Sequence, residues 1–325
     1  MKKSLKTAAL VIAVTIALFA LHKMGSQVGN VLVHAKWSMI ALAVAGLTMY
    51  QFLNASIWKD VFAGLGLKVS RCATARVWIE SESMKWLPGG IWGYGSRVVN
   101  ARKLGADIRP ASAALAIELS LTVLAWGTVA LCILPTAIGH DLQSRALAWV
   151  SNSAQVTWLA VGATTLAAFT LLAFLLTIPR VKATLGSILR RFVPSVAGMK
   201  LQPRSLVRAW TSYLGLCLFN GTLLWLITLA IPGLNVPWAA VIGIGGVAWL
   251  VGFFAIGIPG GIGVREAALA GLLVWYGPME AAVAAAVLFR VAQVVAELIA
   301  LASSLIVSWK NARNTLAECG YTVLS

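Results

Sequence analysis

Two motifs of one proline and two glycines carry the clearest chemistry in this chain. Pro88-Gly89-Gly90 is followed by Arg97, and Pro259-Gly260-Gly261 is followed by Arg265 and Glu266. Proline is favoured in the first turn of a helix, and paired glycines allow close approach of another group. A helix that starts inside a protein offers unpaired N–H groups and a positive dipole end, which suit phosphate or carboxylate. We therefore predict that these residues bind an anion, with the arginines adding charge.

The spacing of the two motifs supports this interpretation. Their prolines are 259 − 88 = 171 residues apart in a chain of 325 residues, about half its length. Interrupted apolar segments at corresponding places in two halves are typical of transporter binding sites. The alternative is that each motif only kinks or ends a helix, with glycine allowing tight packing.

A second set of candidates consists of polar residues inside apolar segments. Glu118 lies in one such segment, and Arg290, Gln293 and Glu297 share one face of another because of their spacing. Ionisable residues at membrane depth are costly and usually face a bundle interior or a wet cavity. They could gate transport, couple it to protons or contact a headgroup. Alternatively, Arg290 pairs with Glu118 or Glu297 and only locks the helices together.

Two further acids precede the first motif. Glu80 and Glu82 could bind a cationic headgroup or a coupling cation, or they could form a solvated cytoplasmic face. The sequence has no DxD motif, no Ser/His/Asp set and no nucleotide-binding loop, and its four cysteines are widely separated. We therefore expect no catalytic residue, no metal and no cofactor, and we expect that the chain is not an enzyme.

The elements that must position these residues are membrane helices. Hydrophobic residues make up 60% of the chain and charged residues 11%, whereas soluble domains carry about 25% charged residues. We predict an all-α polytopic bundle of about seven or eight spanning helices. It forms one domain over residues 1–325, and its two halves, at about 1–170 and 171–325, form an inverted repeat. The predicted spans are Leu5–Leu21, Trp37–Ile57, Ala111–Pro135, Val156–Ile178, Trp210–Ile231, Trp238–Ile258 and Ala281–Trp309.

Two shorter apolar segments remain: Trp78–Tyr94, which contains the first motif, and Gly261–Tyr276, which begins at the last residue of the second motif. Both are predicted to be re-entrant half-helices, although the second could also cross as a short tilted helix. The side of the C-terminus depends on this choice.

Charge indicates the location and orientation of the chain. The net charge of +16 comes mainly from two basic connections, 59–109 and 180–208. The positive-inside rule places both of them and the N-terminus in the cytoplasm. Because the basic residues lie in loops between apolar spans, we expect them to face anionic headgroups rather than nucleic acid.

The first motif and its surroundings also resemble a known family. The stretch Glu82–Tyr94, followed by Arg97 and Ala101–Gly105, is similar to the first signature of the lysylphosphatidylglycerol synthase transmembrane-region family. This family forms the flippase-like part of the multiple peptide resistance factor proteins. The stretch Gly257–Ala268 resembles the second signature. The resemblance implies lipid handling by a stand-alone membrane domain without the aminoacyl-transferase domain.

These observations lead to a functional hypothesis. We expect a multi-pass protein of the bacterial inner membrane that moves an anionic phospholipid or a lipid-linked intermediate. The alternatives are a membrane enzyme of lipid or lipid-linked glycan synthesis, and an accessory subunit of such a pathway. A homodimer or a partner enzyme stays open, as do the lipid, the direction and the energy source.

Overall fold

The computed structural model describes residues 26–86, 92–147, 201–255 and 259–318, and in these ranges it contains helices and turns but no strands. The predicted all-α fold is therefore confirmed. The predicted spans Leu5–Leu21 and Val156–Ile178 lie outside the described residues.

Four of the described helices are long and apolar enough to cross a membrane. They are α3 (Trp37–Gly64), α6 (Ile108–Leu147), α9 (Pro203–Ala230) and α12 (Met279–Glu318). The apolar helix α10 (Trp238–Phe254) is shorter. These helices confirm the prediction of a polytopic helical bundle.

The predicted starts were more accurate than the predicted ends except for α9, which begins at Pro203 rather than at Trp210 and ends at Ala230, next to the predicted Ile231. Helices α3 and α10 begin at the predicted residues, Trp37 and Trp238. Helices α6 and α12 continue past their predicted ends, to Leu147 and Glu318. Hydropathy marks where an apolar segment ends, whereas a helix continues as long as its backbone hydrogen bonds do.

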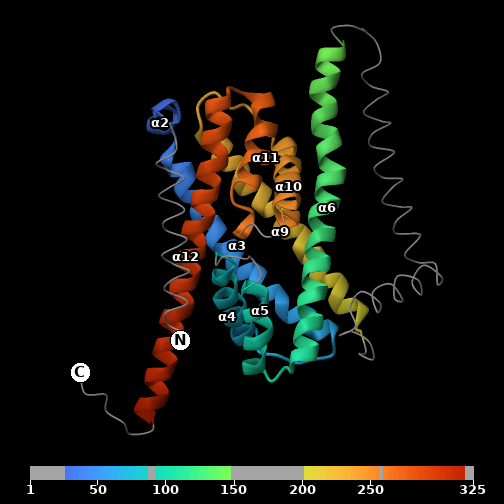
Figure 1. Cartoon of the computed structure of the whole chain (residues 1–325), viewed down its shortest axis with the longest axis vertical. Coiled ribbons are helices and arrows are strands. Elements are labelled where there is room, and N and C mark those ends of the chain that lie inside the picture. Colours follow the sequence, from blue (N-terminus) through green and yellow to red (C-terminus); the bar gives the residue numbers. More distant parts are fainter. Residues whose placement is uncertain (1–25, 87–91, 148–200, 256–258, 319–325) are drawn as a thin grey trace, which may run out of the picture.

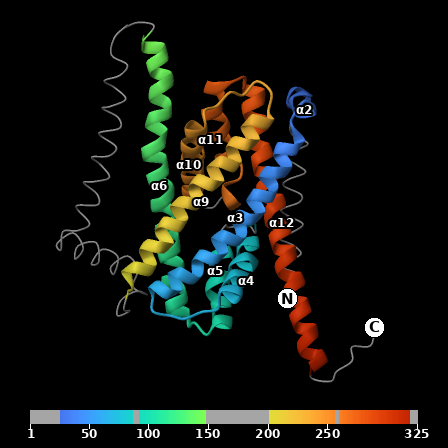
Figure 2. The same ribbon diagram turned by 180° about the vertical axis from the view of Figure 1, so that it is seen from behind.

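Helices α3 and α9 form an antiparallel pair (Figure 2). At one end the Lys36 N–H donates to the Ala230 carbonyl, at 2.9 Å. At the other end the Gln202 N–H donates to the Gly64 carbonyl, at 2.7 Å. Because backbone bonds join both ends, the register of this pair is fixed independently of its side chains.

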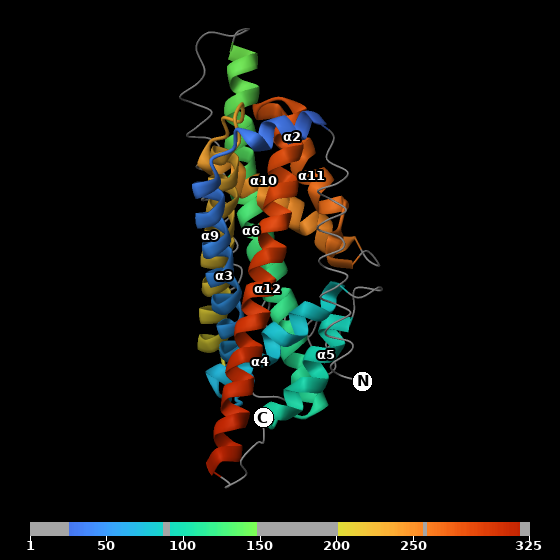
Figure 3. The same ribbon diagram turned by 90° about the vertical axis from the view of Figure 1, so that its left-hand side faces the viewer.

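Two groups of short helices lie toward opposite ends of the long ones (Figures 1 and 3). The inner end of one group contacts the inner end of the other through η1 and η4. In the sequence, the first group lies on both sides of the first proline–glycine motif, and the second group contains the second motif. The first group consists of α4 (Arg71–Glu82), η1 (Ser83–Trp86), α5 (Trp92–Asn100) and η2 (Ala101–Leu104). The second group follows α10 and consists of η4 (Pro259–Gly261), α11 (Val264–Leu273) and η5 (Val274–Tyr276). A further short helix, α2 (Ser26–Val33), precedes α3.

The buried apolar residues form two main clusters separated by a polar band. Along α3, Leu47 belongs to one cluster and Ala55 to the other. Along α9, Cys217 and Leu223 are divided in the same way, with the buried polar residue Asn220 between them. Burying a polar group between apolar clusters is costly unless it meets water or a partner. The band is therefore the part of the bundle where a binding site is expected.

Close helix packing depends on Gly221 of α9, which generates a prediction. A Cβ atom at this position would lie 2.7 Å from Ile242 Cγ1 and 3.0 Å from Ile242 Cα. We expect Gly221→Leu to lower the free energy of unfolding by about 1–3 kcal/mol through overpacking. Thermal unfolding in detergent micelles would measure the change.

Gly215 on the same helix supplies the matched control, because a Cβ atom there would meet nothing within 4 Å. Gly215→Leu should leave the unfolding temperature unchanged or raise it, since leucine favours helix more than glycine does. Equal destabilisation by both substitutions would contradict the packing argument.

Candidate functional site

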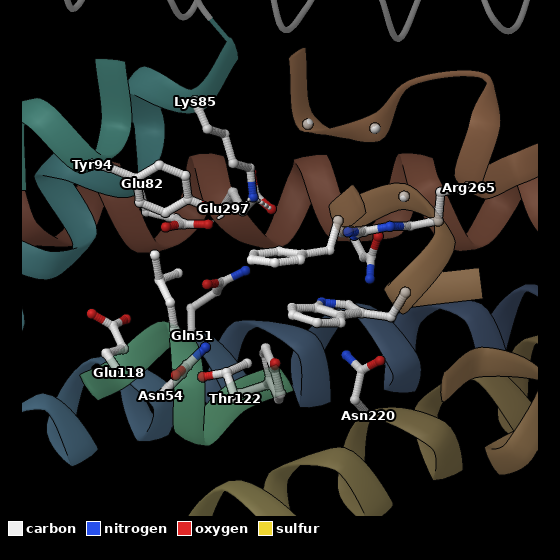
Figure 4. Close-up of a pocket in the computed structure, with 18 of the residues that line it drawn as sticks. Gln51, Asn54, Glu82, Lys85, Tyr94, Glu118, Thr122, Asn220, Arg265 and Glu297 are labelled. Carbon is white, nitrogen blue, oxygen red and sulfur yellow. Dashed lines mark hydrogen bonds and ion pairs between the residues drawn. The ribbon is translucent and has the colours of Figure 1, made fainter. Parts of the chain in front are cut away.

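A cavity of about 490 Å³ lies in the polar band (Figure 4). Its walls come from the long helices α3, α6, α9 and α12, from α10, and from both groups of short helices. The cavity is neither sealed nor a shallow surface depression. It combines charged, amide, hydroxyl and aromatic side chains.

Residues that flank both proline–glycine motifs line this one cavity. Lys85 and Arg97 come from the two sides of the first motif, and Gly260 and Arg265 come from the second. The first motif itself, Pro88-Gly89-Gly90, lies outside the described residues, so its conformation stays a prediction.

Arg97 is the centre of a buried charge cluster. Its side chain is 2% exposed, and its Nη1 and Nη2 atoms lie 2.6 Å from Glu118 Oε1 and from Glu82 Oε2. Its Nε donates to Ser81 Oγ at 2.9 Å, and Trp78 Nε1 donates to Glu118 Oε1 at 2.7 Å. Since charge is costly in an apolar interior, this dense pairing is what allows Arg97 and Glu118 to be buried. The cluster joins α4, α5 and α6.

Lys85 links the first short-helix group to α12. Its Nζ lies 3.0 Å from Glu82 Oε1 and 2.7 Å from Glu297 Oε1. Trp86 Nε1 donates to the other carboxylate oxygen of Glu297, at 3.0 Å. One carboxylate of α12 therefore holds two successive residues of η1.

Arg290 links α12 to the second group. Its Nε lies 3.0 Å from Glu266 Oε1, and its Nη2 donates to the Gly260 carbonyl at 2.7 Å. Its Nη1 donates to Gln293 at 3.3 Å, and its guanidinium lies over the Trp86 ring, 4.8 Å from the centroid. Arg290 thus contacts both short-helix groups at the place where they meet.

Arg265 differs from the other cavity cations. Within the described ranges it forms no ion pair, and its Nε is buried without a hydrogen-bond partner. Its guanidinium lies 5.8 Å from the centroid of the Trp249 ring. A cation without an acidic partner in a site largely shielded from water would be stabilised by an anionic ligand.

The second motif adopts a backbone that requires glycine. Gly260 and Gly261 have φ values of 58° and 68°, which side chains other than glycine rarely tolerate. A Cβ atom at Gly261 would also lie 2.8 Å from the Gly252 carbonyl oxygen. The motif is therefore packed against α10.

The helix that follows the second motif binds one of its own acids. Helix α11 starts at Val264, and the Gly263 N–H donates to Glu266 Oε2 at 2.6 Å. The positive end that we predicted as an anion site thus already holds a carboxylate of the chain. Glu266 does not line the cavity, but it pairs with Arg290, which does.

The other predicted residues divide into two groups. Arg290, Gln293 and Glu297 all line the cavity, which confirms that they share one face of α12. Glu82 and Glu118 line it as well, whereas Glu80 does not and lies 4.0 Å from Lys103 Nζ.

The structure differs from the pairing considered for Arg290. As the alternative to a functional role, it was considered to pair with Glu118 or Glu297, but it pairs with Glu266. Glu118 is held by Arg97, and Glu297 by Lys85.

Sequence reasoning missed the uncharged polar wall of the cavity. Gln51 and Asn54 of α3, Thr122 of α6 and Asn220 of α9 line it, and all lie in helices long enough to span. The available signal was the presence of amides inside the apolar spans. Lone amides lower the mean hydropathy of a span little, and for that reason they were overlooked.

A family model described as "Lysylphosphatidylglycerol synthase TM region" matches residues 7–300, which is most of the chain. No curated protein matches the chain.

The charge cluster around Arg97 generates a prediction. Arg97→Met removes the ion-pair partner of buried Glu118 and should lower the free energy of unfolding by about 3–5 kcal/mol. Adding Glu118→Gln should recover part of this loss, because the carboxylate is then uncharged. Thermal unfolding in detergent would compare the two variants.

Arg208→Met provides the control. Arg208 is 63% exposed and 3.5 Å from Asp60, so its loss should cost little. If the double variant is no more stable than Arg97→Met alone, buried charge is not the reason for the cluster.

Proposed function

Because the chain belongs to the lysylphosphatidylglycerol synthase transmembrane-region family, we propose that it moves an anionic phospholipid or a lipid-linked intermediate across the bacterial cytoplasmic membrane. The observation that carries this proposal is Arg265, a cavity cation without an acidic partner among the described residues. An anionic headgroup is the ligand that would neutralise it.

The size and position of the cavity support this proposal. Ligand pockets have volumes of about 300–1,000 Å³, and a cavity of about 490 Å³ falls within that range. It lies between apolar clusters, on helices long enough to span a membrane. In the proposed mechanism the headgroup enters the cavity while the lipid chains stay in the bilayer.

The ion pairs to α12 would form the gate. Lys85–Glu297 and Arg290–Glu266 join the two short-helix groups to one helix. A phosphate that binds Arg265 lies near these pairs and would compete with the carboxylates for their cations. Breaking one pair would free one group to move relative to α12, as alternating access requires.

The remaining polar residues would take supporting roles. Glu82 and Gln293 would hold Lys85 and Arg290 while their other partners exchange. The Arg97–Glu118 pair, which is almost fully buried, would stay fixed. We propose no catalytic step in this mechanism.

Reconstitution tests the function directly. Vesicles that contain the purified chain and traces of fluorescent phosphatidylglycerol or polyprenyl phosphate would be treated with a membrane-impermeant quencher. Protein-dependent quenching of the inner-leaflet fraction is expected. If no anionic lipid moves faster than in protein-free vesicles, the proposed function is rejected.

Arg265 provides the first functional prediction. Arg265→Gln should slow the movement of fluorescent phosphatidylglycerol roughly 10- to 100-fold, because a hydrogen bond to a charged group contributes about 1.5–3 kcal/mol. Arg208→Gln removes an exposed arginine outside the cavity and should leave the rate unchanged. A wild-type rate for Arg265→Gln would show that this cation does not bind the headgroup.

The proposed gate provides a second prediction. Lys85→Glu places a third carboxylate beside Glu82 and Glu297 and should strongly reduce the rate in the same assay. Adding Glu297→Lys restores an opposite charge, so the double variant should regain part of the rate. Absence of recovery, with both proteins folded, would argue against the Lys85–Glu297 pair as a gate.

A further inference from the structure

The cavity has a second wall whose chemistry the anion site leaves unexplained. Gln51, Asn54 and Asn220 project from α3 and α9, with Thr122 of α6 nearby (Figure 4). Gln51 and Asn220 are only 7% and 6% exposed. Figure 4 shows Asn54, Thr122 and Asn220 on one side and Lys85 and Arg265 on the other, with Gln51 between.

The three amides form no side-chain hydrogen bond within the described part of the chain. A buried amide without a partner loses the hydrogen bonds that water would give it. Gln51 and Asn54 are three residues apart and therefore share one face of α3. Three such groups around one cavity indicate a ligand, or water, that satisfies them.

The charged wall restricts what that ligand can be. The acids of the cavity all have cationic partners: Glu82 and Glu297 bind Lys85, and Glu118 binds Arg97. An ammonium group would have to displace Lys85 or Arg97 to reach a carboxylate. Arg265 is a cavity cation without an ion pair among the described residues, and the amides are neutral. Glu118 Oε2 also lacks a hydrogen bond, but its carboxylate is already paired with Arg97. A cationic headgroup therefore fits less well than an anionic one with neutral polar groups.

Amides match hydroxyl groups in particular. An asparagine or glutamine side chain both donates and accepts, and so does a hydroxyl. Trp249 and Phe253 also line the cavity, with their rings stacked on each other at 5.1 Å and 11°, and they add apolar area beside the amides.

We propose that the substrate is a phosphodiester lipid with several headgroup hydroxyls, an inference that rests on the proposed transport function. Its phosphate pairs with Arg265, and its hydroxyls bind Gln51, Asn54 and Asn220. Glycerol and hexose headgroups share this chemistry, and the experiment separates them.

Binding can be measured without transport. Native mass spectrometry of the full chain in detergent micelles would compare four short-chain probes. Phosphatidylglycerol and phosphatidylmethanol have the same charge but differ in hydroxyls; a short polyprenyl hexosyl phosphodiester and phosphatidylethanolamine complete the set. We expect one of the hydroxylated anions to bind roughly 2- to 10-fold more tightly than phosphatidylmethanol for each hydrogen bond gained.

The amide variants connect this preference to the wall. Asn54→Leu and Asn220→Leu should each remove roughly 2- to 10-fold of the preference for the hydroxylated probe, with phosphatidylmethanol binding unchanged. Ser56→Ala and Thr222→Val, on the same two helices but outside the cavity, should preserve the preference. Thermal unfolding would confirm that all four variants are folded.

The outcomes separate this inference from the proposed function. Preference for phosphatidylglycerol or for the hexosyl probe supports the inference and identifies the headgroup. Equal binding of phosphatidylglycerol, the hexosyl probe and phosphatidylmethanol, or preference for phosphatidylethanolamine, overturns it while transport can stand. If none of the four binds and no anionic lipid moves in vesicles, the proposed function fails as well.

Discussion

The need to neutralise charge between apolar surfaces organises this molecule. The cavity lies between two apolar clusters, and ionised groups placed there are costly unless they are paired. Arg97, Lys85 and Arg290 meet this condition by binding acids from other helices. The same ion pairs hold the short helices against α6 and α12. The contacts that neutralise these charges are therefore also contacts that hold the tertiary structure together.

The long helices α3 and α9 are held to each other by different contacts from those that hold the short-helix groups to α12. Helices α3 and α9 are joined by backbone hydrogen bonds at both ends and by close packing of glycine against neighbouring side chains. The short-helix groups contact α12 through side-chain ion pairs as well as through apolar packing of α11, and the ion pairs can exchange partners without unfolding a helix. Such a division suits a protein in which one part moves against a fixed frame.

Sequence reasoning found the charged part of the site but not its connections. The all-α fold, the starts of α3 and α10 and the shared face of Arg290, Gln293 and Glu297 follow from hydropathy and helical spacing. The partner of Arg290 could not be predicted from the sequence, because it depends on how η4 and α11 fold back onto α12. The amides were missed since hydropathy averages over a whole span and barely registers one polar residue. The functional roles of these residues remain proposals.

Glu266 has a consequence for the unliganded protein. It occupies the start of α11 and at the same time neutralises Arg290, so this region carries its own tethered counter-ion. A tethered group competes at a high effective concentration, which dissolved chloride or inorganic phosphate must overcome. Small dissolved ions should consequently be poor competitors, and an anion held by additional contacts should compete better.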